Sequence, residues 1–170
     1  KASDDAAGLA VGTGLKADAA VLKQAAINSQ QSIAILSIAD GGLAQVSDIL
    51  ERQKVLAAQS ASGTVSDTER AYIATEFTAL TNEVNAIETA VTFNGDALLD
   101  GGFNFNVLVG TAGADIIALD LSGVNVDSTT IGYNAAAVGT NANAVTAIGL
   151  VETAIGNIVA DRATVGALQS

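Results

Sequence analysis

Five residue types are missing from this 170-residue chain, two aromatic types are scarce, and the missing thiol and imidazole groups exclude several classes of chemistry. There is no cysteine, histidine, methionine, tryptophan or proline, and only two tyrosines and four phenylalanines are present. No disulfide can form, so the fold does not depend on an oxidising compartment. Without thiol or imidazole groups a zinc site is not expected, and no histidine can activate a serine nucleophile. We therefore predict a non-enzymatic protein without a cofactor.

Basic residues are also scarce. Seven lysines and arginines stand against 18 aspartates and glutamates, which gives a formal net charge of −11. Binding to phosphates or to an anionic membrane surface requires clustered positive charge, so nucleic acid is excluded as a partner. The longest uncharged run lies between Asp127 and Glu152 and contains Asn, Thr and Gly. This run is unlike a membrane span, and we predict no membrane insertion.

Alanine and leucine dominate the first part of the chain at helical spacing. Ser3 is placed to cap a helix, and Asp4 and Asp5 fit the positive end of its dipole. We predict one helix over about 4–61, because an apolar row repeats every seven residues as in a coiled coil. The row is Leu15, Leu22, Ser29, Leu36, Leu43, Leu50, Ala57. A second row begins with Ala19, Ala26, Ile33 and passes to Ala39, Val46.

Two glycines weaken this helical pattern, and a short turn ends it. Gly41-Gly42 is the weakest point of the first helix and could bend it, since each glycine costs up to about 1 kcal/mol relative to alanine. The segment "SASGTVSD" then ends the helix. Ser66 and Glu69 form a capping-box pattern that predicts a second helix over about 66–91. Its expected buried row is Ile73, Phe77, Leu80, Val84, Ile87, Val91.

Residues 93–140 change from helical to alternating periodicity. Turn signals and alternation at Phe103, Phe105, Val107 and Val109 predict a small unit rich in β-hairpins. Asp115, Asp120 and Asp127 follow, but a calcium loop requires oxygen ligands at every second position and a closing glutamate, which this stretch lacks. The sequence-level prediction is therefore that no metal is bound.

A last helix is predicted over about 143–169. Its expected buried row is Ile148, Val151, Ile155, Ile158, Arg162, Val165. Arg162 interrupts this row, and two interpretations stay open. Its aliphatic stem can pack while the guanidinium reaches water or a facing acid. Alternatively, a fixed polar contact from Arg162 can set the register between helices.

None of the three helices can bury its apolar row alone, so they are expected to pack side by side. The fold class is mainly α with a small β portion. We predict an elongated, coiled-coil-like three-helix rod, with one very long helix and two shorter ones, capped by β-hairpins. Residues 1–170 are expected to form a single domain.

Four segments, in this order, resemble the conserved core of bacterial flagellin. They are "KASDDAAGLA", "LERQKVLAAQSASGTVSD", "NAIETAVTFNGDALLDG" and "IVADRATVGALQS". The resemblance covers about residues 1–100 and 143–170, and only about 50 residues separate the two flanks, so it implies a flagellin with minimal outer domains. The first residue is not methionine. We expect that terminal polymerisation segments have been removed from both ends.

The resemblance implies a structural subunit of the flagellar filament, secreted to the cell exterior, whose partners are other flagellin subunits. Without the terminal segments, this chain is expected to be unable to assemble. Two other functions stay open. One is a cell-surface adhesin or polysaccharide-binding homologue on the same fold. The other is a hook–filament junction protein.

The resemblance also implies a contact surface for other proteins. In flagellins recognised by the flagellin-sensing Toll-like receptor, an Arg and a Leu one turn apart on the first helix act with a Glu on the second. Here these positions are similar to Arg52, Leu56 and Glu76. Val55 departs from the pattern, since receptor-active flagellins tend to have an acid there. The alternatives are a contact between subunits, or a solvated Arg52 with Leu56 in the core.

Overall fold

The computed structural model describes residues 6–169 and contains three helices and two small sheets. In chain order these are α1 (Ala6–Ser60), α2 (Asp67–Ala90), β1 (Thr92–Phe93), β2 (Asp96–Ala97), β3 (Asn104–Leu108), β4 (Ile116–Asp120) and α3 (Asn141–Gln169). The mainly α fold class with three helices, one of them very long, is confirmed. The helix ends lie within two residues of the predicted ones, except at the start of α1. The expected caps Ser3, Asp4 and Asp5 lie outside the described residues.

The chain divides into two compact units. The first contains α1 up to Ile35 together with Asn104–Leu119, and we call it the hairpin unit. The second, which we call the three-helix unit, contains Leu36–Phe103 and the chain from Asp120 onward. Helix α1 thus supplies residues to both units. Because the prediction of a single domain concerns the whole chain, it stays a prediction.

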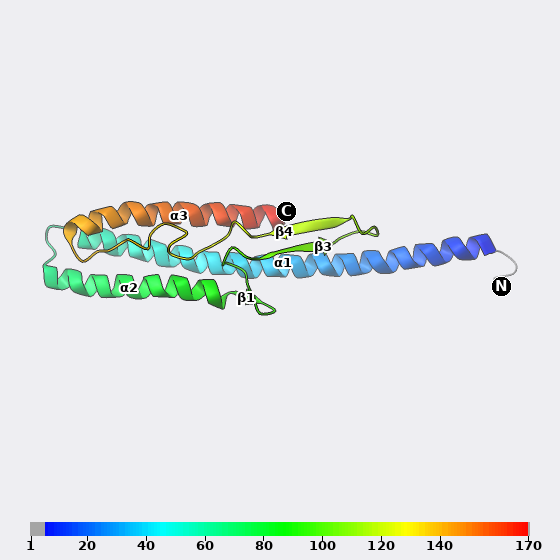
Figure 1. Cartoon of the computed structure of the whole chain (residues 1–170), viewed down its shortest axis with the longest axis horizontal. Helices are drawn as coiled ribbons and strands as arrows, with labels where there is room; N and C mark the ends of the chain where they lie inside the picture. The colour runs from blue at the N-terminus through cyan, green and yellow to red at the C-terminus, as the bar shows by residue number, and fades with distance from the viewer. Residues whose placement is uncertain (1–5, 170) are drawn as a thin grey trace. The chain divides into compact units, whose positions relative to one another are not determined.

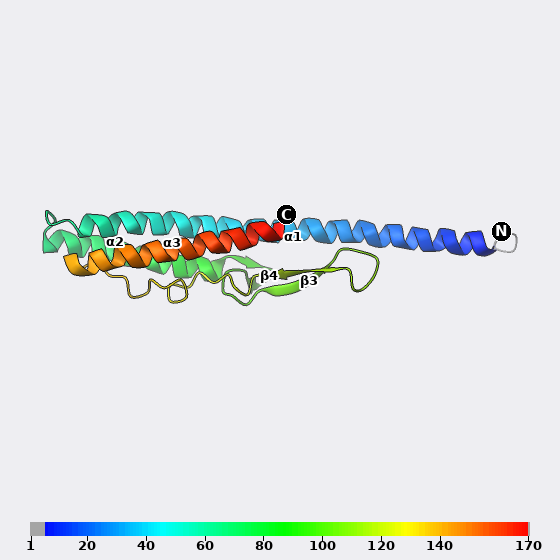
Figure 2. The same ribbon diagram turned by 90° about the horizontal axis from the view of Figure 1, so that it is seen from above.

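In the three-helix unit, α2, α3 and the part of α1 from Leu36 onward lie side by side (Figure 1). Figure 2 shows the same arrangement from a perpendicular direction. The predicted heptad row of α1 is buried throughout this unit, from Leu36 through Leu43 and Leu50 to Ala57. The second row, Ala39 and Val46, is buried beside it. Removal of these apolar side chains from water is the main stabilising contribution to the unit.

The hairpin unit buries far less of α1. Leu15 and Leu22 belong to the same heptad row but are exposed, so the row is a buried seam only from Leu36 onward. Strands β3 and β4 form a two-stranded sheet whose Val107 and Leu119 are buried. The side-chain amide of Asn28 donates a hydrogen bond to the backbone oxygen of Leu108 at 3.1 Å. This bond joins α1 to β3.

The predicted β-rich unit of residues 93–140 contains less β structure than expected. Strands β1 and β2 form an antiparallel pair that turns at Asn94 and Gly95, both with positive φ. After β4, the described part of the chain contains no further strand before α3, only turns and one bridge between Asp100 and Asn125. The segment 121–140 nevertheless contributes to the core, because Ile131 and Tyr133 are buried.

The glycine pair of α1 has two different environments. The helix continues through both glycines, so neither ends it. A Cβ atom added at Gly42 would lie 2.8 Å from side-chain carbons of Leu99 and of Val91, whereas one at Gly41 would have no neighbour within 4 Å. Gly42 is therefore explained by close packing, while the structure gives no packing reason for Gly41.

This contrast leads to a testable prediction. Gly41→Ala should raise the free energy of unfolding by up to about 1 kcal/mol, because alanine has the higher helix propensity. Gly42→Ala should lower it by about 1–2 kcal/mol, because the new methyl group overpacks against Leu99 and Val91. Urea unfolding of both variants, followed by circular dichroism, measures the two signs. Equal stabilisation by both substitutions would contradict the packing argument.

Candidate functional site

The structure brings together two of the three residues predicted to make contacts with other proteins. The guanidinium of Arg52 on α1 donates to the Glu76 carboxylate on α2, from Nε at 2.8 Å and from Nη2 at 2.6 Å. The side chains keep 52% and 46% of their surface exposed, so the pair is available to a partner. Exposed ion pairs contribute little to stability, about 0–1 kcal/mol.

The third predicted residue, Leu56, lies elsewhere. It is only 1% exposed and packs in the core of the three-helix unit. As the protein is folded, Leu56 is not available as an apolar contact beside Arg52. Any contact surface at this place must therefore use other apolar side chains.

Two exposed apolar residues flank the ion pair: Val55, which the sequence analysis noted only as a departure from the receptor pattern, and Tyr72, which it missed. Val55 is 57% exposed and Tyr72 is 74% exposed. The short connection between α1 and α2 makes these helices antiparallel, and Arg52 meets Glu76, so Val55 and Tyr72 lie about one turn nearer that connection. The missed signal was Tyr72, an aromatic residue outside the expected buried row of α2. We call Arg52, Val55, Tyr72 and Glu76 the α1–α2 surface.

A buried arginine fixes the connection between these two helices. Arg70 is 6% exposed, and its guanidinium donates to the backbone oxygens of Ser60, Ser62 at 3.3 Å and Val65 at 2.7 Å. The last carbonyls of a helix have no partner within the helix, and Arg70 supplies one at the end of α1. The only carboxylate paired with it among the described residues is that of Asp67 at 3.5 Å.

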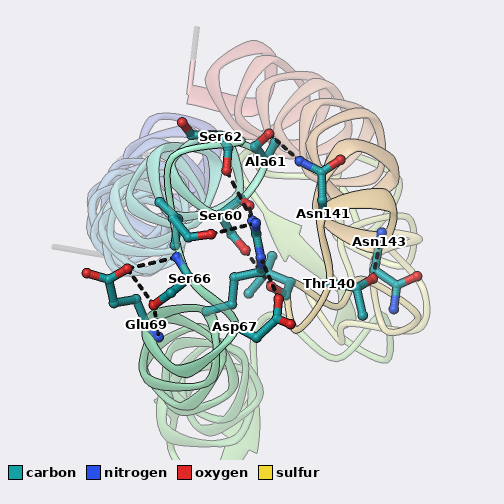
Figure 3. Close-up of polar contacts among 12 residues, drawn as sticks. Ser60, Ala61, Ser62, Ser66, Asp67, Glu69, Thr140, Asn141 and Asn143 are labelled. Carbon is teal, nitrogen blue, oxygen red and sulfur yellow. Dashed lines mark hydrogen bonds and ion pairs between the residues drawn. The ribbon is translucent and has the colours of Figure 1, made fainter.

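Two further sets of contacts hold the same connection (Figure 3). The predicted capping box is present: the Ser66 hydroxyl accepts from the backbone nitrogen of Glu69, and the Glu69 carboxylate accepts from that of Ser66 at 2.8 Å. The Ser66 hydroxyl also donates to the Glu69 carboxylate at 2.7 Å, and this bond together with the one from the Ser66 backbone nitrogen lowers the pKa of Glu69. The side-chain amide of Asn141, at the start of α3, donates to the backbone oxygen of Ala61 at 2.5 Å. All three helices of the three-helix unit are thus joined at one end.

The buried row of α3 differs from the predicted one. Its buried residues are Ala144, Ala147, Val151, Ala154, Ile158 and Val165. Ile148 and Ile155, which were expected to be buried, are only half-buried. The error came from giving the large isoleucines priority over alanines, although alanine lets helices approach closely. In this corrected row, spaced alternately by three and four residues, the position between Ile158 and Val165 belongs to Asp161.

The charge that interrupts the α3 row is therefore that of Asp161 and not that of Arg162. Arg162 is exposed, and its Nε donates to the Asp40 carboxylate on α1 at 2.8 Å. This contact with a facing acid was one of the two interpretations of Arg162, while its role in setting register stays a prediction. Asp161 is half-buried, and burial raises its pKa to about 6.

The raised pKa of Asp161 predicts a pH dependence of stability. The usual aspartate pKa is near 3.9, so the folded chain binds the proton more tightly than the unfolded chain, and stability falls as pH rises from about 4 to about 6. Asp161→Asn should remove this effect and raise the free energy of unfolding at pH 8 by about 1 kcal/mol, allowing for partial solvent screening. Urea unfolding of both proteins in monovalent salt, repeated at pH 4 and pH 8, measures this difference in the free energy of unfolding. The gain should vanish at pH 4, and a gain that is independent of pH would contradict it.

No arrangement of catalytic or metal-ligating groups stands out in residues 6–169. No group of three or more His, Cys, Asp or Glu side chains is placed to hold a metal ion in this range. Helices α1 and α3 have the length and apolar composition of membrane spans, with mean hydropathies of 1.5 and 1.4 over an 18-residue stretch of each. Core helices meet the same criterion, and both helices contribute buried rows to the three-helix unit.

These features define a class of protein: a mainly helical protein built on one very long helix, with exposed ion pairs between neighbouring helices. Comparison with known proteins is specific. The family model described as "Bacterial flagellin N-terminal helical region" matches residues 1–104. This match covers more than half of the chain, and the chain belongs to the bacterial flagellin family.

Relatives and solved structures agree with this assignment. Polar flagellin F of Vibrio parahaemolyticus is 33% identical over 77% of this chain and 35% of its own length. A flagellin of Halalkalibacterium halodurans is 36% identical over 75% of this chain and 47% of its own length. The crystal structure of Bacillus cereus flagellin has a TM-score of 0.73 at 27% identity, covering 83% of this chain and 81% of that one. This chain spans about a third to a half of the length of the two curated relatives.

Proposed function

We propose that this chain is the core of a structural subunit of the bacterial flagellar filament, that it acts outside the cell after secretion, and that its main partners are further copies of the same protein. The observation that carries the proposal is the family match over residues 1–104. The packed three-helix unit supports it, because a filament subunit needs a rigid body that presents fixed surfaces to its neighbours. On the same grounds we propose that the chain has no enzymatic activity and forms one domain.

Polymerisation of the full-length protein tests this function. The full-length protein should form filaments visible by electron microscopy when it is seeded with filament fragments. We further propose that the 170-residue chain alone does not polymerise, since it matches only 35% and 47% of the length of these two relatives. Sedimentation should then give a monomer. A full-length protein that stays monomeric under every seeding condition would contradict the filament proposal.

A second proposed function is recognition by the flagellin-sensing Toll-like receptor through the α1–α2 surface. The exposed Arg52–Glu76 pair, flanked by exposed Val55 and Tyr72, favours it. Arginine and tyrosine are the residues that most often dominate the energy of protein interfaces. The same surface could instead serve contacts between subunits, and the two uses are separable by experiment.

Receptor-dependent signalling distinguishes these uses. Arg52→Ala should weaken activation of reporter cells about tenfold, the effect of losing about 1.4 kcal/mol of binding free energy. Lys54→Ala is a matched control, because Lys54 is two residues from Arg52 on a different face of α1 and makes an exposed 3.5 Å ion pair with Glu152. Equal activity of the two variants would exclude Arg52 from receptor contact. A filament defect in Arg52→Ala alone would assign the surface to subunit contacts.

A further inference from the structure

A fully buried glutamine lies in the seam between α1 and α2. Gln53 is 0% exposed and continues the second α1 row, in which steps of seven residues lead from Ala39 through Val46 to Gln53. Glutamine is rarely buried to this extent, because a buried polar group needs hydrogen bonds in place of water. The α1–α2 surface does not include Gln53, since its side chain does not reach solvent. Any role of Gln53 therefore lies within the fold.

The side-chain amide of Gln53 contacts a single turn of α2. Its Nε2 donates to the backbone oxygen of Phe77 at 3.1 Å and to the hydroxyl of Thr81 at 2.9 Å. The Thr81 hydroxyl itself donates to the backbone oxygen of Phe77 at 3.1 Å, so it has a partner without Gln53. The Oε1 atom of Gln53 has no hydrogen-bond partner within residues 6–169. An unpaired buried acceptor costs stability, so an apolar residue of similar shape should be tolerated at this position.

The apolar contacts between α1 and α2 do not distinguish the observed alignment of the two helices from one shifted by seven residues. On α1, Leu43 and Leu50 occupy equivalent positions of one buried row. On α2, Ile73 and Ile87 are buried 14 residues apart, with the half-buried Leu80 midway between them. A shift by seven residues would replace each of these side chains by another large apolar one on the same helix face. Apolar burial has no direction, so it does not select between such alignments.

The exposed ion pair between the two helices does not distinguish these alignments either. Arg52 binds Glu76, and the residues seven positions before and after Glu76 are Glu69 and Glu83. All three glutamates are exposed on one face of α2. A carboxylate would therefore face Arg52 in each of the three alignments.

The hydrogen bonds of Gln53 do distinguish them. A shift by seven residues would replace Thr81 by Ala74 in one direction, which removes the hydroxyl. In the other direction it would replace Thr81 by Glu88, which carries a charge into the seam at a high cost in hydration. We propose that Gln53 selects the register of α1 against α2 at a cost in stability, as a single polar residue does in the seam of a coiled coil.

Refolding kinetics of the purified chain test the proposal. The variant is Gln53→Met, because methionine is unbranched, adaptable and apolar. Its urea midpoint should equal or exceed that of the original chain. About a fifth or more of the molecules should nevertheless refold in an additional phase, at least about tenfold slower, because misaligned helices must separate before they pair correctly. Prolyl isomerisation cannot produce such a phase, since the chain has no proline.

Spin labels identify the misaligned helices directly. Glu51→Cys on α1 and Thr89→Cys on α2 introduce thiols at exposed positions, and the labels attach only there because the chain has no cysteine. Samples are frozen during the slow phase, and the distance between the labels is measured by double electron–electron resonance. Gln53→Met should give a second distance, displaced by up to about 10 Å, which is the length of seven helical residues. The same pair of labels in the chain with Gln53 should give one distance.

A matched control separates loss of register from a general gain in hydrophobicity. Gln59→Met is the same chemical change at an exposed position of α1, and it should refold like the original chain. A slow phase in both variants would overturn the proposal. Refolding of Gln53→Met without a slow phase, or with a slow phase but no displaced distance, would overturn it as well. A Gln53→Met variant that is clearly destabilised would instead assign Gln53 an ordinary stabilising role.

Discussion

Leu50→Ala should lower the free energy of unfolding by about 3–5 kcal/mol. Leu50 is 0% exposed and lies in the middle of the buried α1 row, between Leu43 and Ala57. Truncation removes the transfer free energy of the side chain and leaves a cavity that three packed helices cannot fully close. Urea unfolding followed by circular dichroism measures the loss, and the midpoint should fall without a large change in the slope m.

Leu22→Ala is the matched control for this prediction. Leu22 belongs to the same seven-residue row and undergoes the same chemical change, but it is 51% exposed in the hairpin unit. Its substitution should change stability by no more than about 0.5 kcal/mol, because little buried surface is lost. A comparable loss from both substitutions would mean that the row is buried along its whole length, contrary to the structure.

Arg70→Ala should cost about 3 kcal/mol of unfolding free energy. The substitution leaves the backbone oxygens of Ser60, Ser62 and Val65 without their charged donor, in a place that is largely shielded from water. Unsatisfied buried acceptors cost about 1–3 kcal/mol, and hydrogen bonds from a charged group are the stronger ones. Thermal and urea unfolding both report the change.

Two further variants identify the cause of this loss. Arg70→Lys keeps the charge but not the planar fork of donors, so it should recover less than half of the stability. Lys54→Ala removes an exposed basic residue from the same unit and should cost less than about 0.5 kcal/mol. Full rescue by lysine would show that positive charge, rather than the three backbone contacts, is what the connection between α1 and α2 requires.

The helices were predictable because their signals are local. Ser66 and Glu69 form the capping box that their spacing indicated, and the predicted row of α2 is largely buried, with Ile73, Phe77 and Val84 in the core. The periodicity of α1 correctly identified its apolar row, but it did not indicate which part of that row is buried. Leu22 and Leu50 occupy equivalent positions in the row, and only the surrounding tertiary structure distinguishes them.

The candidate sites were harder to predict because they depend on tertiary structure and not on local sequence signals. From the sequence, Arg70 would be expected to be an exposed helix residue. Only the path of the chain after Ser60 brings three backbone oxygens to its guanidinium. The row of α3 was misplaced because alanine carries little hydrophobic signal, although Ala144 and Ala147 are fully buried. Placing the row on isoleucines moved the interrupting charge by one residue, from Asp161 to Arg162.

The contacts around Arg70 also set an order for folding. The bonds that join α1 to α2 connect residues 10 to 28 positions apart in sequence, whereas those that bring α3 to α1 or to Ala61 just after it span 80 to 122 positions. Short loops close at a lower entropic cost, so the α1–α2 hairpin should form first and α3 should dock afterwards. Because the chain has no proline, no slow isomerisation should interrupt this sequence. A chain that refolds in this way regains its longest-range contacts last and loses them first when it opens.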